Sequence, residues 1–305
     1  MSALATLIAA PAGFWAHLDL ALYANIMVAG LLTGAVYGLM ALGLSVIFGV
    51  IRIVNFAHGE MMVLAMYAAY VFNRHTGLDP LVTLPLVTLA LFFLGYGLQR
   101  LLINRYISRP DHEQFLLLLA LATVITASLL MGFGPDARNV QLAYAYDSYE
   151  LGPVLLDKVR VIAAAGAVIG AAALWGFFRF TRTGKAIRAC ADNQTGAAVV
   201  GLDVKRLYAV TFGLGAACVG AAGCLMLLLV DVQPYIATDY TLLAFIIVIL
   251  GGLGSMPGAL LGGLLVGVSE ALCGFVIEPS FKSAFSFALL ILVLLVRPQG
   301  LLGRA

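Results

Sequence analysis

Thr181-Arg-Thr-Gly-Lys-Ala-Ile-Arg-Ala-Cys-Ala-Asp-Asn-Gln194 is the one long, clearly basic polar stretch in a chain of 305 residues that is 63% hydrophobic. Only 10% of the residues are charged, whereas soluble domains carry about 25%. Apolar runs near the roughly 20 residues needed to cross a bilayer recur on both sides of the stretch. The sequence therefore predicts an all-α, polytopic transmembrane protein, treated as a single domain over residues 1–305, with this stretch as a loop in water.

Several classes of protein are disfavoured by composition. The net charge of +2 is small and spread along the chain, so no nucleic acid is expected as a partner. Met1 to Asp19 contain no Lys or Arg, which predicts no cleaved secretory signal peptide. The cysteines lack Cys-x-x-Cys spacing, so we predict neither a disulfide framework nor a metal site. They are Cys190, Cys218, Cys224 and Cys273.

The apolar runs predict about eight to ten membrane spans. Candidate spans cover 24–50, 56–72, 81–99, 114–134, 160–178, 207–230, 241–254, 259–277 and 284–296. Lys and Arg favour cytoplasmic loops. If the loop at about 180–206 is cytoplasmic, alternation places twelve basic residues inside and five outside. The opposite orientation reverses this ratio, so we predict that this loop is cytoplasmic.

Two apolar regions differ from a single, regular membrane span in length or composition. Leu20 to Ile51 is long for one span, so it is either one tilted helix or a span with a broken piece. Between Thr241 and Ile277, a glycine-rich segment predicts at least one discontinuous helix, because Pro and Gly disfavour a helix interior. This break either lines a pathway or forms a tight turn between two spans. Its candidate residues are Gly251, Gly252, Gly254, Ser255, Pro257 and Gly258.

Glycines also recur at the small-xxx-small spacing that lets helices approach closely. Gly30, Gly34 and Gly38 form one such series, and Gly263 with Gly267 forms another. This spacing predicts helix packing, within the chain or against a second membrane subunit.

Four polar side chains lie in or beside predicted spans. On a helix, Asn55 and His58 share a face whereas His58 and Glu60 do not, so a shared metal site is not expected. These three residues either cap a helix at the cytoplasmic surface, or line the mouth of a pathway or hold two helices in register. Glu270 lies near mid-span, where a carboxylate costs roughly 2.5 to 3.5 kcal/mol. It is predicted to face the protein interior or water, as a pathway residue or a structural hydrogen-bonding group.

The basic loop itself predicts a docking element for another protein. A helix from Lys185 to about Val200 would present small side chains flanked by charge, which allows close approach of a partner. An ordinary positive-inside loop would explain the basic residues but not the alanines, glycines and length. The candidate docking residues are Thr183, Gly184, Lys185, Ala186, Arg188, Ala189, Asp192, Asn193, Ala197 and Gly201.

Motifs of enzymes are not found. Gly184-Lys185 is followed by Ala186 and lacks the upstream glycine of a phosphate-binding loop, so ATP binding by this chain is not predicted. The chain contains neither His-Glu-x-x-His nor Gly-x-Ser-x-Gly. We therefore predict no catalytic residue, no cofactor and no metal.

Five motifs together resemble membrane permease subunits of ATP-driven (ABC) importers for branched-chain and other hydrophobic amino acids. They are Gly34-Ala-Val-Tyr-Gly-Leu-Met-Ala-Leu-Gly-Leu44, Asn55-Phe-Ala-His-Gly-Glu60, Thr183-Gly-Lys-Ala-Ile-Arg-Ala189 leading to Gly201-Leu-Asp203, Leu250-Gly-Gly-Leu-Gly-Ser-Met-Pro-Gly258 and Arg297-Pro-Gln-Gly300. The second motif resembles the shorter of the two paralogous permeases of such importers.

The resemblance implies a multi-pass protein of the bacterial inner membrane, in contact with lipid. It implies a sister permease, two cytoplasmic ATPases that hold the ATP, a periplasmic binding protein and an amino-acid substrate. The loop at about 180–206 would be the coupling element that docks on an ATPase. Permeases for urea, short amides or aromatic acids share nearly the same pattern, and a stand-alone ion-coupled carrier or channel using Glu60 or Glu270 is the rival class.

Overall fold

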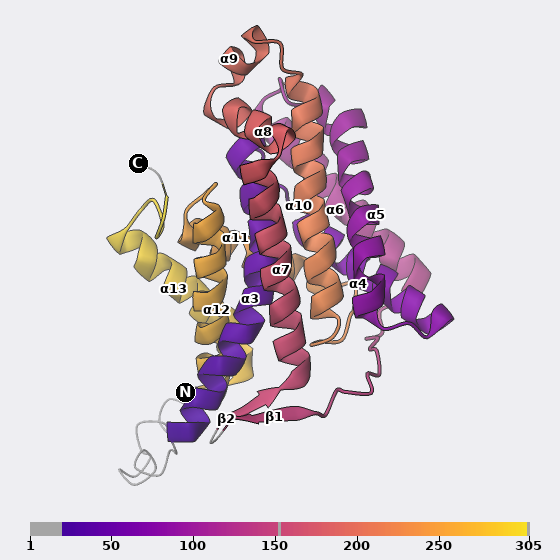
Figure 1. Ribbon diagram of the computed structural model, residues 1–305, viewed down its shortest axis with the longest axis vertical. Helices are drawn as coiled ribbons and strands as arrows, with labels where there is room; N and C mark the ends of the chain where they lie inside the picture. Colours follow the sequence, from indigo (N-terminus) through magenta and orange to yellow (C-terminus); the bar gives the residue numbers. More distant parts are fainter. Residues whose placement is uncertain (1–19, 152–153, 304–305) are drawn as a thin grey trace.

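A computed structural model describes residues 20–151 and 154–303 as a bundle of helices (Figure 1). Its long helices are α3 (Leu20–Ile51), α4 (His58–Thr76), α5 (Pro80–Leu101), α6 (Asp111–Phe133), α7 (Lys158–Phe180), α10 (Val204–Met226), α11 (Ile236–Gly251), α12 (Met256–Val276) and α13 (Lys282–Val296). The shorter elements are α8 (Arg182–Asp192), α9 (Gln194–Val199), two 3₁₀ turns (Ile103–Arg105 and Pro279–Phe281), β1 (Ser148–Leu151) and β2 (Val154–Asp157).

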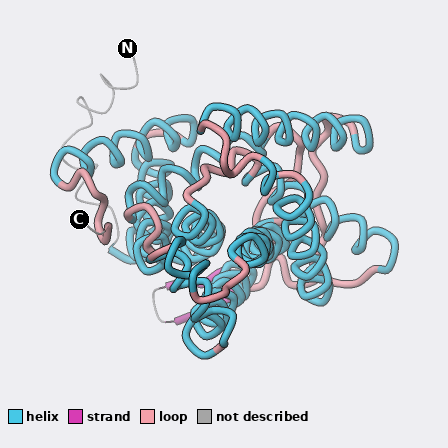
Figure 2. Tube along the Cα trace, turned by 90° about the horizontal axis from the view of Figure 1, so that it is seen from above, coloured by secondary structure: helices cyan, strands magenta, loops and turns pink. Residues whose placement is uncertain are grey.

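The predicted all-α polytopic fold is confirmed. Among the described residues, seven helices are long and apolar enough to cross a membrane, and Ile236–Gly251 is a shorter apolar helix. Viewed from above, the described trace is helical apart from its loops and the two short strands (Figure 2). The signal-peptide prediction concerns residues 1–19, which lie outside the described residues.

The centre of the bundle is formed by α3 and α10. The most apolar window of α3 is 78% buried and that of α10 is 83% buried, against 17% in α6 and 6% in α13. The long N-terminal run is one unbroken helix of 32 residues. At 1.5 Å per residue it is about 48 Å long, and it crosses the bundle obliquely (Figure 1). The exposed apolar faces of α6 and α13 remain for lipid or another chain.

Glycine contacts hold α3 against α12, because glycine lets two backbones approach within van der Waals distance. A Cβ added at Gly34 would lie 2.7 Å from the carbonyl oxygen of Gly263, and one added at Gly30 would lie 2.8 Å from that of Gly267. Gly267 packs in turn on the backbone of Gly34. The small-xxx-small series of the sequence thus pack within this chain.

The two ends of the bundle differ in structure. At one end, which we call the α8–α9 end, these two short helices project beyond the long ones (Figure 1). At the other, the hairpin end, β1 and β2 pair antiparallel. The amide of Leu155 in β2 donates to Asn25 Oδ1 on α3 at 2.7 Å. Nearby, the hydroxyl of Tyr144 donates to Asp79 Oδ2 at 2.6 Å. Burial and this carboxylate raise the pKa of Tyr144.

The predicted helix break is a tight turn between two antiparallel helices. Helix α11 ends at Gly251 and α12 begins at Met256. Gly252 and Gly254 have φ of 104° and 79°, values that only glycine adopts without strain. On the inside of the turn, the backbones of Gly251 and Gly258 are in direct contact.

The C-terminal segment covers this turn. The amide of Leu301 donates to the carbonyl of Leu250 at 2.9 Å, and the amide of Leu302 donates to that of Gly251 at 2.9 Å. Ser255 Oγ accepts the amide of Gly258 at 3.2 Å and so caps the start of α12. These backbone groups at the break are therefore hydrogen-bonded within the protein.

Candidate functional site

A non-helical segment enters the bundle between α3 and α4. Helix α3 ends at Ile51, and the next residue, Arg52, has a φ of 60°. In the segment that follows, Ile53, Asn55 and Ala57 are buried. Helix α4 then begins beside Met40, which lies about three helical turns before the end of α3. The surface-cap alternative of the sequence analysis is therefore wrong, because these polar groups are packed inside the protein.

The start of α4 forms a polar cluster with α3 and α11, which we call the α4 polar cluster. His58 Nε2 lies 3.0 Å from the carbonyl oxygen of Met40. The amide of Gly59 donates to Thr241 Oγ1 at 2.9 Å, and this hydroxyl donates to Glu60 Oε2 at 3.0 Å. His58 is fully buried and Glu60 is 5% exposed. The hydrogen bonds thus connect three helices at one depth.

Asn55 belongs to this region in a different way from the one predicted. It precedes α4 instead of sharing a helical face with His58, and its Oδ1 accepts the amide of Ala57 at 3.1 Å. Asn55 therefore shapes the buried turn into α4. His58 and Glu60 bond to different neighbours, and no group of three or more His, Cys, Asp or Glu in the described part of the chain is placed to hold a metal ion.

Removing the Thr241 hydroxyl is expected to destabilise the protein. The Thr241→Val variant would leave the amide of Gly59 and one oxygen of Glu60 without their partner, at a cost of about 1 to 3 kcal/mol. Thr211→Val is the matched control, because that hydroxyl is equally buried but bonds only to Leu207 of its own helix. Thermal unfolding in detergent should show a markedly lower midpoint for Thr241→Val alone, and equal midpoints would contradict the prediction.

Glu270 lies in a separate polar cluster. Its Oε2 accepts the hydroxyl of Tyr37 on α3 at 3.1 Å, and its Oε1 accepts that of Ser286 on α13 at 3.4 Å. The carboxyl group faces the protein interior, in one of the positions that the sequence analysis allowed. It connects the peripheral helix α13 to the central helix α3, whereas Asn55, His58 and Glu60 meet elsewhere.

The basic loop forms two helices instead of the predicted one. Thr181 caps α8 by accepting the amide of Gly184 at 2.9 Å. Asn193 interrupts the helix with an extended backbone, φ −149° and ψ 100°, and its Oδ1 accepts the amide of Gly196 at 2.8 Å to start α9. The prediction of a continuous helix from Lys185 to Val200 is therefore wrong, because the Asn193 side chain caps a new helix.

The predicted docking residues divide by exposure. Gly184 and Ala197 are buried, Gly184 against the backbone of Phe178, so neither can meet a partner. Cys190 lies on the buried face of α8, where desolvation raises the pKa of its thiol. Ala186 is half-buried. The exposed candidates are Thr183, Lys185, Arg188, Ala189, Asp192, Asn193 and Gly201.

Two residues outside the predicted set are the most exposed apolar groups here. Val199 and Val200, at the end of α9, are 81% and 76% exposed. A pair of β-branched residues closing a polar stretch was the available signal in the sequence. Together, α8 and α9 project beyond the bundle with basic side chains along α8 and an apolar tip at α9.

The fold is that of a polytopic α-helical membrane protein. Polar groups are buried between its apolar helices, and a two-helix element projects beyond them. The chain belongs to the branched-chain amino acid transport system permease component family, whose model matches residues 26–294. It is therefore a transport subunit, and the family resemblance predicted from its motifs is confirmed.

Two curated relatives cover nearly the whole chain, and a third covers part of it. The high-affinity branched-chain amino acid transport system permease protein LivH of Salmonella typhimurium is 32% identical over 90% of this chain and 94% of its own length. The corresponding BraD protein of Pseudomonas aeruginosa is 30% identical over 92% and 96%. The probable permease LivM of Methanocaldococcus jannaschii is 28% identical over 40% of each chain. No solved structure shows a significant match.

Proposed function

We propose that this chain is the permease subunit of an ATP-driven importer that carries branched-chain and other hydrophobic amino acids across the bacterial inner membrane. The observation that carries the proposal is the likeness to proteins named as high-affinity branched-chain amino acid permeases, which spans 94% of the Salmonella relative. A periplasmic binding protein would deliver the substrate. ATP would be hydrolysed on separate subunits, since this chain carries no phosphate-binding loop.

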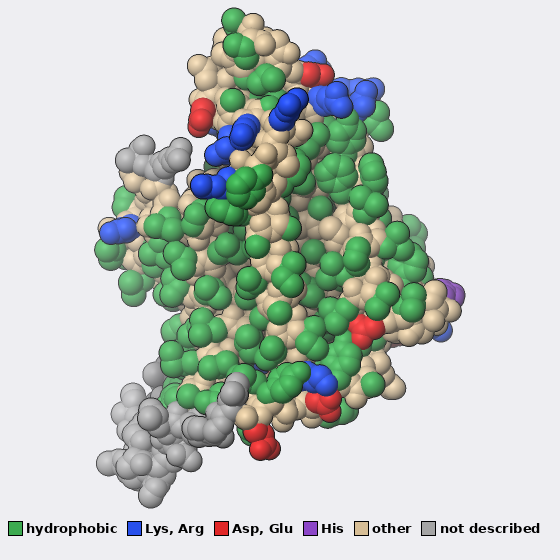
Figure 3. Space-filling view, in the orientation of Figure 1, with side chains coloured by type: hydrophobic (Ala, Val, Ile, Leu, Met, Phe, Trp, Pro, Cys, Tyr) green, Lys and Arg blue, Asp and Glu red, His purple; other side chains and the backbone are tan. Residues whose placement is uncertain are grey.

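The α8–α9 end would face the cytoplasm. Lys and Arg side chains gather there, whereas the acidic side chains of the hairpin end are visible at the bottom of the same face (Figure 3). Cytoplasmic loops carry the excess of basic residues in multi-pass proteins. In this orientation the hairpin and the Tyr144 region would face the periplasm, where the binding protein arrives.

The α8–α9 element would dock on an ATPase. Arg188 and Ala189 are exposed on α8, and the apolar tip at Val199 and Val200 suits insertion into a groove of a soluble partner. The Thr181 hydroxyl donates to the carbonyl oxygen of Phe177 on α7 at 2.7 Å, and the buried Gly184 packs on the backbone of Phe178. A movement of the docked ATPase would therefore be transmitted directly to a membrane helix.

A sister permease would complete the pathway. Helices α6 and α13 are the least buried of the long apolar helices and offer surface for a second membrane subunit. The partial likeness to a LivM permease is consistent with a pair of related permeases. The α4 polar cluster and the Tyr37–Glu270–Ser286 cluster would hold helices in register as the pathway alternates its access.

Reconstitution tests this function. The chain would be co-expressed with a sister permease, ATPases and a binding protein from the same organism, and the complex placed in liposomes. We expect uptake of radiolabelled leucine that requires both ATP and the binding protein, with competition by isoleucine and valine. Competition by urea, short amides or aromatic acids instead would assign a different substrate class. Uptake by this chain alone, driven by an ion gradient without ATP, would overturn the proposal in favour of a carrier.

A further inference from the structure

A polar cavity of about 790 Å³ lies between the end of α5 and the start of α10. Its walls come from α5, the turn after it, and the first residues of α10, and it opens near the α8–α9 end. The lining residues are Tyr96, Arg100, Asn104, Arg105, Ser108, Asp203, Lys205 and Arg206. None of these residues belongs to the α4 polar cluster or to α8 and α9.

The cavity carries a large excess of positive charge. Four of its residues are cations, and Asp203 is the single carboxylate in its lining. Asp203 Oδ1 already accepts the backbone amide of Arg206 at 3.1 Å, as the cap of α10. Basic side chains gather over the ends of α5 and α10 in the space-filling view (Figure 3). A site of this charge favours a multivalent or phosphate-bearing anion.

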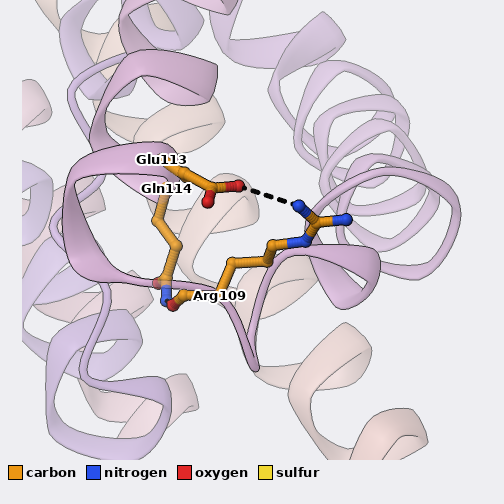
Figure 4. Close-up of polar contacts among 3 residues, drawn as sticks. All are labelled: Arg109, Glu113 and Gln114. Atoms are coloured by element: carbon orange, nitrogen blue, oxygen red, sulfur yellow. Dashed lines mark hydrogen bonds and ion pairs between the residues drawn. The ribbon is translucent and has the colours of Figure 1, made fainter.

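Arg109, close to the cavity in sequence, differs from the cavity cations because it has a carboxylate partner. Arg109 donates to Glu113 Oε2 at 3.3 Å, and its carbonyl oxygen accepts Gln114 Nε2 at 2.9 Å (Figure 4). The ion pairs among the described residues join Arg109 to Glu113, Lys158 to Asp147 and Arg160 to Asp157. Within that part of the chain, the four cations of the cavity thus have no carboxylate partner within ion-pair distance.

The walls of the cavity are held in place by hydrogen bonds between its elements. Asn104 Nδ2 donates to the carbonyl oxygen of Lys205 at 3.3 Å, so the turn after α5 is joined to the start of α10. The buried Gln99 donates to Asn104 Oδ1 at 3.0 Å, and Arg100 donates to the hydroxyl of Tyr96 at 3.2 Å. The side chains of Arg100 and Asn104 are therefore oriented before any ligand binds, which lowers the entropic cost of binding.

An apolar stripe on α5 leads directly to the cavity. Leu86, Leu89 and Phe93 are 52%, 53% and 62% exposed, at the spacing of one helix face. Continuing by three and four residues, the same face carries Tyr96 and Arg100, which line the cavity. The surface therefore changes from apolar to cationic along one stripe, as an amphipathic ligand with an anionic head would require.

We propose that this cavity binds the phosphate-bearing headgroup of an anionic phospholipid, with the acyl chains lying along the apolar stripe of α5. Arg105 and Lys205, from opposite walls, would contact the phosphate. A soluble phosphate compound would satisfy the cations but would leave the stripe unused, which is why the lipid is favoured. The lipid would brace the start of α10 against α5 beside the α8–α9 element.

Native mass spectrometry of the detergent-purified protein, titrated with phosphatidylglycerol or phosphatidylcholine, tests the proposal. We expect phosphatidylglycerol to bind with higher affinity, and the double variant Arg105→Gln, Lys205→Gln to lose about ten- to thirtyfold in that affinity. Binding of phosphatidylcholine should not change. The matched control is Arg179→Gln, Arg297→Gln, which removes two exposed charges outside the cavity and should retain the preference.

Three other outcomes would overturn the proposal. Equal binding of the two lipids would show that the protein does not recognise the charge of the headgroup. Unchanged phosphatidylglycerol affinity in the double variant, with an unchanged thermal midpoint as evidence of folding, would place the lipid elsewhere. Binding of inorganic phosphate or a free nucleotide by calorimetry, abolished in the double variant while phosphatidylglycerol adds nothing, would assign the cavity to a soluble phosphate compound.

Discussion

Replacement of Gly34 by leucine is expected to abolish recovery of folded protein. Even one methyl group at this position would lie 2.7 Å from the Gly263 carbonyl oxygen and 2.9 Å from the Leu264 Cα. Both obstacles are backbone atoms of α12, which cannot rotate away as a flexible side chain can. Relief requires α3 and α12 to separate, and this would undo contacts along the central helix of the bundle. Overpacking of one methylene already costs about 1 to 3 kcal/mol in well-packed cores.

The measurement is the yield of monodisperse protein by size-exclusion chromatography of a fluorescent fusion. Gly34→Ala should lower the yield and the thermal midpoint, and Gly34→Leu should leave only aggregate. The control is Gly132→Leu, since a Cβ added at this exposed glycine of α6 would meet no atom within 4 Å. A normal yield of Gly34→Leu would show that α3 and α12 are not packed backbone to backbone.

The helices could be predicted because their signal is local. An apolar run of about 20 residues has few alternatives to a membrane helix. The spacing of Gly30, Gly34 and Gly38 likewise predicted a close helix contact. It did not identify the partner, because Gly263 and Gly267 lie more than two hundred residues further along the chain. Which glycine series meet is decided by the tertiary fold.

The segment before α4 could not be placed from its sequence. Arg52 and Asn55 are typical of a short loop at the membrane surface, and that reading required no other part of the chain. The burial of Asn55 depends on contacts made by the residues after it with Met40 and Thr241. Such a re-entrant segment is stable inside a bundle only because neighbouring helices satisfy its polar groups, and the local sequence does not contain those neighbours.

In contrast, the break between α8 and α9 could have been predicted from the sequence. Asn193 is a residue type that favours the N-cap position of a helix, yet the alanines on both sides favoured one continuous helix. Placing the break there turns Ala197 inward and leaves Val199 and Val200 exposed. The predicted docking surface of small residues is therefore in part an apolar tip.

We expect the double variant Val199→Asp, Val200→Asp, which places two charges on this apolar tip, to lose ATP-driven uptake. The two side chains are more than three-quarters exposed, so the variant should fold normally. If the tip fills an apolar groove of the ATPase, each carboxylate would have to be desolvated without a partner. An uncompensated buried charge costs about 3 to 5 kcal/mol, so affinity for the ATPase should fall by about a hundredfold or more.

Co-purification of the ATPase with the tagged permease, and leucine uptake by the reconstituted complex, measure this effect. Gln194→Asp, Thr195→Asp adds the same two charges to exposed polar positions of the same short helix. It should therefore retain both the ATPase and uptake. If both variants fail equally, net charge near α8 and α9 decides docking and the apolar tip has no special part. If the valine variant keeps its ATPase but loses uptake, the tip transmits movement without providing affinity, because binding and coupling would then reside on different residues of one element.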